Sequence, residues 1–320
     1  MSERKTIVIV GPCYNEAGNI EELYSRCTKV MEKFPQYDYR FLFADNNSTD
    51  GTRDIIRNLA EKDPKVTAIF NANNYGHIRS PFNALLAAEG DAVVTMCTDL
   101  QDPPELLAEF IQEWENGYKV VLGVRSDTNC SIVMEMIRKF YYFLLSKFAP
   151  NENLIHCFTG FGLYDKCFMD ALRKFKEPYP YFRGLVSEIG FNRKEIKFVQ
   201  PERKRGITKN NFMTLYDMAM TGFVNHTKLP LRLAAMSGFV IAFFCFIATF
   251  VYLIIKLLFW DTFQLGLAPL ILGMFFLGAI QLIFIGIIGE YIGAIWTQVR
   301  NRPLVIEEER INFPEEKSKE

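Results

Sequence analysis

The chain has 320 residues, with 36 basic and 37 acidic side chains, so its formal net charge is −1. A chain so close to neutral has no strong positive field, which argues against recruitment of nucleic acid by charge alone. The charges are also unevenly distributed, because between Leu233 and Gln298 only Lys256, Asp261 and Glu290 are charged. The composition therefore predicts a soluble domain followed by a membrane domain.

The first part of the chain alternates short apolar segments with segments of helical periodicity. The apolar segments that we predict to be strands are Thr6–Val10, Arg40–Ala44, Val66–Phe70, Ala92–Met96 and Val120–Val124. Asp50 and Asp102 stand where the N-terminal caps of two intervening helices are expected. This alternation predicts an α/β domain with a mainly parallel sheet covered by helices on both faces.

Polar clusters follow four of the predicted strands. They are Gly11–Glu16, Asp45–Gly51, Asn73–His77 and Thr98–Glu105. Ligands of parallel sheets bind where the carboxyl ends of the strands meet, so we expect the clusters to share one site. By itself, each cluster is also typical of polar turns and helix caps. The sequence contains neither G-x-G-x-x-G nor G-x-x-x-x-G-K-[ST], which argues against dinucleotide-binding and P-loop proteins.

Two apolar segments in the second part of the chain, Leu233–Ile255 and Leu265–Gly289, contain no charged residue. A helix rises about 1.5 Å per residue, so each segment can cross a hydrocarbon layer about 30 Å thick. The alternative is a pair of buried core helices, but such helices rarely lack a polar face over this length. The short connection between the segments predicts a transmembrane helical hairpin.

Charged residues around the predicted hairpin indicate its orientation. The basic residues that flank its two ends are Lys228, Arg232, Arg300 and Arg302. The connection offers only Lys256, so the positive-inside rule places both chain ends in the cytoplasm. The N-terminal apolar run is too short for a signal peptide, and the seven cysteines fit a reducing cytosol. We expect residues 1–228 to form a cytoplasmic domain, 229–298 the two spans and 299–320 a cytoplasmic tail.

Several motifs of this sequence resemble those of a known enzyme family. They are Pro12-Cys13-Tyr14-Asn15-Glu16, Asp45 through Gly51, Asp99-Leu100-Gln101-Asp102-Pro103-Pro104-Glu105 and Gly289-Glu290-Tyr291-Ile292-Gly293. The first three, in this order, are similar to motifs of inverting nucleotide-sugar glycosyltransferases of the GT-A fold. The chain as a whole resembles the polyisoprenyl-phosphate glycosyltransferases, relatives of dolichol-phosphate mannose synthase. Its C-terminal motif resembles the two-helix membrane anchor of the bacterial members.

The resemblance implies a Rossmann-like GT-A domain followed by a C-terminal two-helix transmembrane hairpin. It implies transfer of a single sugar, with inversion, from a nucleotide sugar to a polyprenyl phosphate. The reaction would take place at the cytoplasmic face of the bacterial plasma membrane, in the synthesis of cell-envelope polysaccharide. UDP-glucose is the donor that we favour. The alternatives are GDP-mannose as donor, another lipid acceptor, and an inactive membrane-anchored scaffold of the same fold.

The departing nucleoside diphosphate carries several negative charges, which a divalent cation with oxygen ligands can neutralise. In the resemblance, Asp99 is the acidic residue at the metal and the diphosphate, and Gln101 is a second ligand of Mg²⁺ or Mn²⁺. The residues implied in nucleotide-sugar binding are Pro12, Tyr14, Glu16, Asp45, Asn74, Gly76 and Asp99. A turn at the end of a strand, or the first turn of a helix, is the structural alternative for these positions.

Three positions depart from the family pattern. Cys97 and Asn46 stand where relatives usually carry acidic residues. Near Gly160, relatives usually carry an aspartate that is proposed as the catalytic base, and this chain lacks it. A phosphate monoester has its second pKa at about 6, so a lipid phosphate is mostly a dianion at pH 7 and can attack without a protein base. If a base is used, Glu188 and Asp165 are the candidates, although a core-edge acid or a helix cap would explain each of them.

A basic segment precedes the first apolar span. The resemblance implies that Arg203, Arg205, Thr208 and Lys209 bind the lipid phosphate, since arginine forks fit phosphate oxygens; a solvated loop is the alternative. Met136–Phe148 and Phe212–Phe223 are aromatic-rich segments that fit either interfacial helices at the bilayer or core helices. Glycines in the second span would permit the close helix packing of a homo-oligomer.

Overall fold

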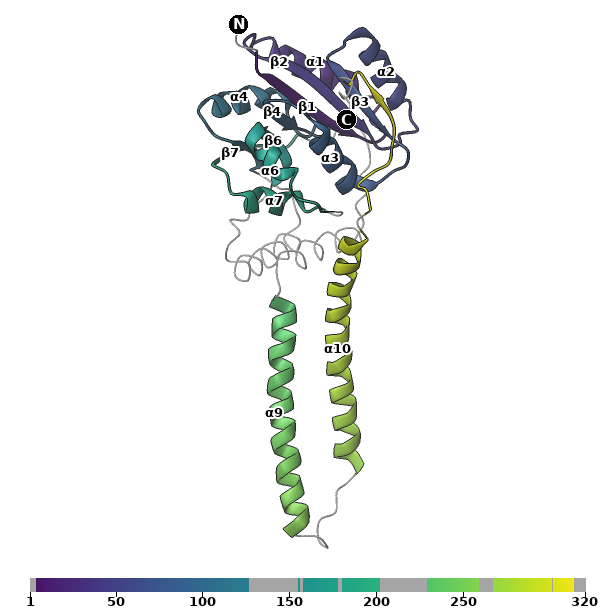
Figure 1. Cartoon of the computed structure of the whole chain (residues 1–320), viewed down its shortest axis with the longest axis vertical. Coiled ribbons are helices and arrows are strands. Elements are labelled where there is room, and N and C mark those ends of the chain that lie inside the picture. Colours follow the sequence, from purple (N-terminus) through teal and green to yellow (C-terminus); the bar gives the residue numbers. More distant parts are fainter. Residues whose placement is uncertain are drawn as a thin grey trace, which may run out of the picture. The chain divides into compact units, whose positions relative to one another are not determined.

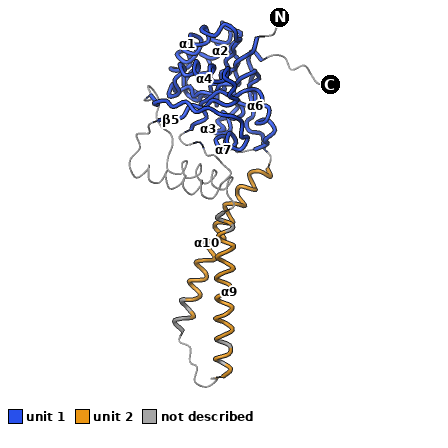
Figure 2. Tube along the Cα trace, turned by 90° about the vertical axis from the view of Figure 1, so that its left-hand side faces the viewer, with its two compact units in different colours: residues 1–142, 150–212, 301–320 blue, residues 143–149, 213–300 orange. Residues whose placement is uncertain are grey.

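The computed structural model describes residues 4–126, 155, 158–177, 180–201, 229–258, 267–300 and 302–313. The chain divides into two compact units (Figure 2). Unit 1 comprises Met1–Tyr142, Pro150–Phe212 and Asn301–Glu320, and unit 2 comprises Phe143–Ala149 and Met213–Arg300. Unit 1 contains a sheet with flanking helices, whereas unit 2 contains two long apolar helices (Figure 1).

The sheet of unit 1 has eight strands in the order β7-β5-β6-β4-β1-β2-β3-β8 within the described residues. Their bounds are β1 (Thr6–Cys13), β2 (Asp38–Asp45), β3 (Val66–Asn71), β4 (Ala92–Thr95), β5 (Val120–Arg125), β6 (Phe158–Asp165), β7 (Arg193–Phe198) and β8 (Glu307–Ile311). Strands β1, β2, β3 and β4 run parallel to one another, and β5 runs parallel to β7. Strand β6 is antiparallel to β4 and β5, and β8 is antiparallel to β3. The sheet thus confirms the five predicted strands and the mainly parallel topology.

Helices cover both faces of this sheet. Their bounds are α1 (Ile20–Met31), α2 (Thr52–Lys62), α3 (Gly76–Ala87), the 3₁₀ helix η1 (Pro104–Leu106), α4 (Leu107–Glu115), α6 (Lys166–Leu172) and α7 (Phe182–Ile189). Successive residues of a strand point to opposite faces. Accordingly, Ile7 and Ile9 join a core cluster with α1, α2 and α4, and Val8 and Val10 join another with α3, α6 and α7. The burial of apolar side chains on both faces confirms the predicted α/β architecture.

Strand β8 follows the apolar helices in the chain and was not predicted from the sequence. It pairs with β3, with Ala68 opposite Ile311. The pairing shifts by one residue further along, because Phe70 lies opposite Glu309 and Asn71 lies opposite Glu307. The extra residue on β8 makes this a β-bulge, a feature that re-aims a side chain. Residues 307–311 therefore belong to the sheet of unit 1.

Unit 2 contains the helices α9 (Leu229–Leu258) and α10 (Leu267–Val299). Their candidate membrane spans are Leu233–Val251 and Gly273–Val299, which are long and apolar enough to cross a bilayer. No residue of these spans is buried within the structure, and Phe239 is 78% exposed. Exposed apolar side chains do not fit the alternative of buried core helices. The segments 136–148 and 212–223, predicted as either interfacial or core helices, lie outside the described residues.

Candidate active site

The carboxyl ends of β1, β2, β3 and β4 bring the four polar clusters to one edge of the sheet (Figure 1). The register of the strands fixes this arrangement. In β1, Cys13 lies opposite Asp45 of β2, and Val10 lies opposite Thr95 of β4. In β3, Phe70 also lies opposite Asp45. The loops that follow these strands therefore start next to one another, as expected for a ligand site of a parallel sheet.

Backbone-to-side-chain hydrogen bonds join the loop after β1 to the loop after β2. The backbone N–H of Asn15 donates to Oγ of Ser48 at 2.8 Å, and that of Glu16 donates to Oγ1 of Thr52 at 2.9 Å. Tyr14 and Glu16, both predicted to bind the nucleotide sugar, are half-buried in the first of these loops. The two loops are thus held as one surface.

Asp45, at the end of β2, is completely buried and is held by Arg53 of α2. Its Oδ2 accepts hydrogen bonds from Nε of Arg53 at 2.7 Å and from the backbone N–H of Ser48 at 3.0 Å. Its buried Oδ1 has no hydrogen-bond partner among the residues that the structure describes. Burial lowers the pKa of Arg53, but its hydrogen bonds to Asp45 and Glu308 raise it, leaving it above its ordinary value. Arg53 therefore stays cationic beside the Asp45 carboxylate.

Asn46 connects the end of β2 to the loop after β3. Its side-chain amide donates to Oδ1 of Asn74 at 2.8 Å and to the carbonyl of Gly76 at 3.2 Å. Its Oδ1 accepts from the backbone N–H of Tyr75 at 2.9 Å. An aspartate at this position has no N–H to donate. Asparagine at position 46 therefore fits the segment after β3, which contains Asn74 and Gly76, both predicted to bind the nucleotide sugar.

The loop after β4 carries Asp99 and Gln101, the residues predicted to hold a metal. Both are half-buried, and the backbone N–H of Gln101 donates to Oδ1 of Asp99 at 3.2 Å. Leu100 between them is buried and has a φ of 60°, which is uncommon for a residue other than glycine. Oγ1 of Thr98 donates to the carbonyl of Pro12 at 3.0 Å. This bond ties the loop of Asp99 to the carboxyl end of β1.

Asp102, which is buried, and Arg125, which is half-buried, are oppositely charged groups that influence each other electrostatically beside this loop, a relationship that the sequence reasoning did not find. Oδ2 of Asp102 accepts from the backbone N–H of Cys97 at 2.9 Å. Burial raises the pKa of Asp102 to about 6, and the charge of Asp99 adds to this effect, whereas the Cys97 N–H and Arg125 oppose it. Burial also lowers the pKa of Arg125, which faces Asp102, Asp99 and Arg183. The position of Arg125 at the carboxyl end of the fifth predicted strand was a usable signal.

Asp165, a predicted base candidate, lies at the opposite edge of the sheet. Because β6 is antiparallel to β4, Asp165 is opposite Ala92, the first residue of β4. It accepts hydrogen bonds from Nε1 of Trp114 at 2.8 Å, Nζ of Lys119 at 3.2 Å and the N–H of Cys167 at 3.0 Å, which caps α6. Burial raises its pKa, but these bonds lower it to about 2. This placement argues against Asp165 as a catalytic base.

The remaining predicted residues are the base candidate Glu188 and the basic segment before the first apolar span. Glu188 is exposed on α7. The pKa of Glu177 is raised mainly by the burial of Glu177 itself, and the charge of Glu188 raises it further. The base role of Glu188 therefore remains a prediction without a described contact to Asp99. The residues predicted to bind the lipid phosphate, Arg203, Arg205, Thr208 and Lys209, lie outside the described residues.

Two glycines of β6 stand where a larger side chain would strain the backbone. Gly160 has a φ of 107°, a conformation that is strained for an aspartate. A Cβ added to Gly162 would lie 2.5 Å from the carbonyl oxygen of Val121, so no side chain fits there without a shift of the backbone. The geometry of β6 is thus built around glycine at both positions.

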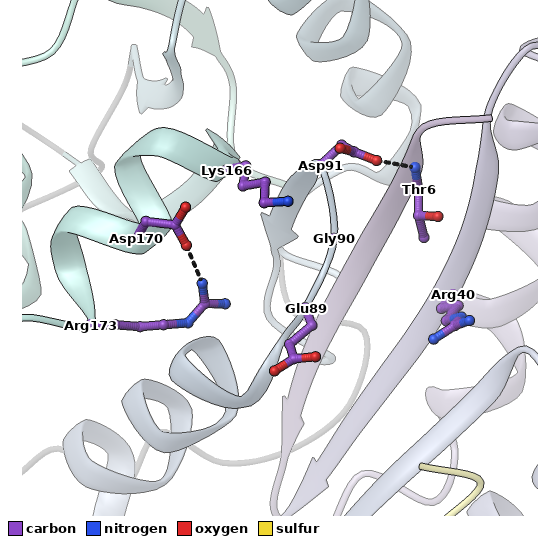
Figure 3. Close-up of a pocket in the computed structure, with 8 residues that line it drawn as sticks. All are labelled: Thr6, Arg40, Glu89, Gly90, Asp91, Lys166, Asp170 and Arg173. Carbon is purple, nitrogen blue, oxygen red and sulfur yellow. Dashed lines mark hydrogen bonds and ion pairs between the residues drawn. The ribbon is translucent and has the colours of Figure 1, made fainter. Parts of the chain in front are cut away.

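A polar cavity of about 350 Å³ lies at the amino ends of β1 and β4 (Figure 3). The N–H of Thr6 donates to Oδ2 of Asp91 at 2.8 Å, and Arg173 pairs with Asp170 at 2.8 Å. This edge of the sheet is opposite to the one that carries Asp99.

No group of three or more His, Cys, Asp or Glu side chains in the described part of the chain could hold a metal ion.

Comparison with known proteins identifies the family of this chain. Residues 8–172 match the family model described as glycosyl transferase family 2. The chain belongs to glycosyl transferase family 2. It is therefore a glycosyltransferase, as the resemblance of the Pro12–Glu16 and Asp99–Glu105 motifs predicted.

Relatives of this family 2 protein match it over nearly the whole length. An uncharacterized glycosyltransferase of Bacillus subtilis (strain 168), YkcC, is 35% identical over 308 residues, or 96% of this chain and 94% of the relative. The SfII prophage-derived bactoprenol glucosyl transferase of Shigella flexneri is 30% identical over 300 residues, or 94% and 96%. The mannosyltransferase PcManGT from Pyrobaculum calidifontis, in complex with GDP-Man and Mn²⁺, is 20% identical with a TM-score of 0.47, covering 72% of this chain and 65% of that one.

Proposed function

We propose that this protein transfers one sugar from a nucleotide-diphosphate sugar to a polyprenyl phosphate at a membrane surface. The observation that carries the proposal is the convergence of Tyr14, Asp45 and Asp99 on one edge of the sheet. The acceptor class is supported by relatives named bactoprenol glucosyl transferases, which match 94% of this chain. It is also supported by α9 and α10, which are apolar enough to place the domain beside its lipid.

The donor would bind across the loops after β1, β2 and β3. Tyr14 offers an aromatic face for the base, and Glu16 offers an acceptor for a hydroxyl or ring N–H. Asp45 has a buried carboxylate oxygen without a described partner, which suits a ring N–H of the base. Asn74 and Gly76 would lie under the nucleotide, and Pro12 would line its pocket. UDP-glucose remains the donor that we favour, and GDP-mannose is the alternative.

A divalent cation, Mg²⁺ or Mn²⁺, would be held by Asp99 and Gln101. The described residues offer no all-protein metal cage, which fits a cation that takes its other ligands from substrate phosphates. Such a cation acts as a Lewis acid on the leaving diphosphate. The chain's own contribution is to hold the Asp99 loop in place through Thr98, whose hydroxyl is bonded to the carbonyl of Pro12.

The acceptor phosphate would attack without a protein base. A phosphate oxygen of the lipid forms a bond to the anomeric carbon of the sugar while the bond to the diphosphate breaks, and a single displacement of this kind inverts that carbon. Near pH 7 the phosphate is mostly a dianion, so no proton has to be removed. Arg125 provides positive charge near Asp99, and Arg183 lies near Arg125; this charge would offset the repulsion between two phosphate groups. The predicted phosphate contacts of Arg203, Arg205, Thr208 and Lys209 would add to this.

The division into a catalytic domain (1–228), two spans (229–298) and a tail (299–320), with the domain and both termini in the cytoplasm, remains part of the proposal. Its support is the charge bias around the hairpin and the two apolar helices. We also propose that the chain forms a homo-oligomer, because the glycines of α10 would permit close packing of helices from two copies. The competing function is an inactive scaffold of the same fold, which the departures at Cys97, Asn46 and Gly160 motivate.

The test uses the full chain in membranes with a panel of labelled nucleotide sugars and polyprenyl phosphate. We expect label to enter the lipid only with a divalent cation, with UDP-glucose as the best donor. Asp99→Asn should abolish transfer, whereas the matched Asp165→Asn at the other sheet edge should retain it. Transfer by Asp99→Asn at the wild-type rate would refute the metal assignment. Binding of nucleotide sugars without turnover, at any donor or cation, would establish the scaffold instead.

A further inference from the structure

Strand β8 reaches the predicted donor site through one arginine. Nη1 of Arg53 donates to Oε2 of Glu308 at 2.9 Å, while its Nε donates to Oδ2 of Asp45 at 2.7 Å. Its Nη2 donates to the carbonyl of Asn71 at 2.6 Å. All three nitrogens of the guanidinium are therefore bonded at once, and Arg53 is held in one orientation between β8 and the Asp45 carboxylate.

The bulge in β8 places Glu308 for this contact. Phe70 of β3 lies opposite Glu309 and Asn71 lies opposite Glu307, so Glu308 is the extra residue of the pairing. A regular pairing would give each residue of β8 its own partner on β3. Bulges re-aim side chains and are common beside active sites, which gives this irregularity a functional reading.

The neighbouring ion pair provides a contrast on the same strand. Glu309 pairs with Arg57, whose guanidinium lies 4.6 Å from the centre of the Phe70 ring; that of Arg53 lies 5.4 Å from the same ring. Both pairs join β8 to α2, and both glutamates are partly exposed. The two arginines differ in their second contact. Arg53 also donates to the buried carboxylate of Asp45, whereas the hydrogen bond described for Arg57 joins it to Glu309.

We propose that Glu308 is a positioning residue for the nucleotide-sugar donor, acting through Arg53 on Asp45. The proposal rests on the proposed function, in which Asp45 contacts the nucleotide. With Glu308 in place, Arg53 holds Oδ2 of Asp45 and leaves Oδ1 for the ligand. Without Glu308, the guanidinium loses one of its three anchors, and Asp45 is held less firmly. Strand β8, which follows the apolar helices in the chain, thereby influences the affinity for the nucleotide-sugar donor.

The test compares Glu308→Ala with Glu309→Ala in the full chain. Each variant removes one ion pair between β8 and α2, so a merely structural role of β8 predicts equal effects. We expect Glu308→Ala to raise the donor KM about two- to five-fold, the range for a partly exposed ion pair, with kcat little changed. Glu309→Ala should leave the donor KM at the wild-type value. Glu308→Gln keeps an acceptor for Arg53 and should give an intermediate KM.

Two results would overturn the proposal. Equal donor KM values for Glu308→Ala and Glu309→Ala would overturn it, as would a wild-type KM for Glu308→Ala. If Glu308→Ala does not fold, the comparison of Glu308→Gln with Glu309→Gln replaces it on the same criteria. If the wild-type chain transfers no sugar, the proposed function fails by itself. The Kd of UDP for the same variants then decides the role of Glu308, with the same ranking expected.

Discussion

The side-chain amide of Asn46 donates a hydrogen bond to Oδ1 of Asn74 at 2.8 Å, joining the loops that follow β2 and β3. The same amide donates to the carbonyl of Gly76, and Asn46 is only 6% exposed. Two loops of the proposed donor site thus depend on one buried amide. An aspartate could not donate either bond, so the contact depends on asparagine at this position.

Asn46→Asp should weaken this junction. The new carboxylate would face Oδ1 of Asn74 and the carbonyl of Gly76 without a proton to share, and such a buried unmatched group costs about 1–3 kcal/mol. We expect a lower free energy of unfolding and a higher donor KM, measured by denaturation and by transfer kinetics. Asn73→Asp is the control, because Oδ1 of Asn73 only accepts, from the N–H of Asn74. Equal stability of the two variants would contradict the prediction.

Thr98→Val should release the Asp99 loop from the carboxyl end of β1. Valine has the shape of threonine but cannot donate to the carbonyl of Pro12, and Thr98 is 2% exposed. The lost hydrogen bond should cost about 1 kcal/mol of stability, and the freed loop should lower kcat more than it changes donor KM. Thr98→Ser retains the hydroxyl and should behave like the wild type. A wild-type kcat in Thr98→Val would show that this bond does not position Asp99.

Asp102→Asn should remove a pH dependence of stability. The folded-state pKa of Asp102, raised by burial from 3.8 to about 6, exceeds its unfolded value, so the folded protein keeps this proton longer. Stability contributed in this way is present below about pH 4 and is lost as the pH rises to about 6. The asparagine can still accept from the N–H of Cys97. It should raise the free energy of unfolding at pH 7 by about 1–3 kcal/mol.

The measurement for Asp102 is denaturation of the full chain in detergent across pH 4.5 to 7.5. The difference between variant and wild type should grow as the pH rises to about 6 and then stay constant. A difference that does not change with pH would show that Asp102 does not titrate in this range.

Asp165→Asn should affect stability rather than catalysis. The folded-state pKa of Asp165 is about 2, below its unfolded value, because its hydrogen bonds outweigh burial. Its contribution is therefore present above about pH 4 and lost as the pH falls to about 2. At pH 7 we expect the variant to lose about 1–2 kcal/mol, with an unchanged transfer rate. Asp170→Asn, at an exposed pair with Arg173, is the control and should change little.

A loss of transfer by folded Asp165→Asn would contradict this structural assignment. It would return Asp165 to the list of base candidates despite its position at the amino end of β4. Thermal unfolding and transfer rate must therefore be measured on the same preparations.

The parallel core of the fold was predictable because its strands carry strong apolar patterns. Strands β1 to β5 are buried on both faces, and their sequences show this directly. Strand β7, with the sequence RKEIKF, and β8, with EEERI, lie at the two sheet edges and are rich in charge. Charged edge strands prevent association between sheets, but they look like polar loops in a sequence. These strands were missed for that reason.

The site was predictable where residues follow strands of known direction. The polar clusters after β1 to β4 met at one edge because parallel strands share their carboxyl ends. Strand β6 was not among the predicted strands, so the position of Asp165 at the opposite edge from Asp99 was not foreseen. Asp102 was expected to cap a helix, yet its carboxylate accepts from Cys97, and its partner Arg125 comes from another strand. Contacts of this kind depend on tertiary structure and have no local pattern.

The position of β8 in the chain also sets an order of events during synthesis. The ribosome must make α9 and α10 before it reaches Glu307–Ile311, so the nascent domain first exists with the edge of β3 open. An open strand edge is a template for aggregation. Arg53 can donate its hydrogen bond to Glu308 only after both apolar helices have been synthesised. The ion pair that holds Arg53 is thus completed only after both candidate membrane spans have been synthesised.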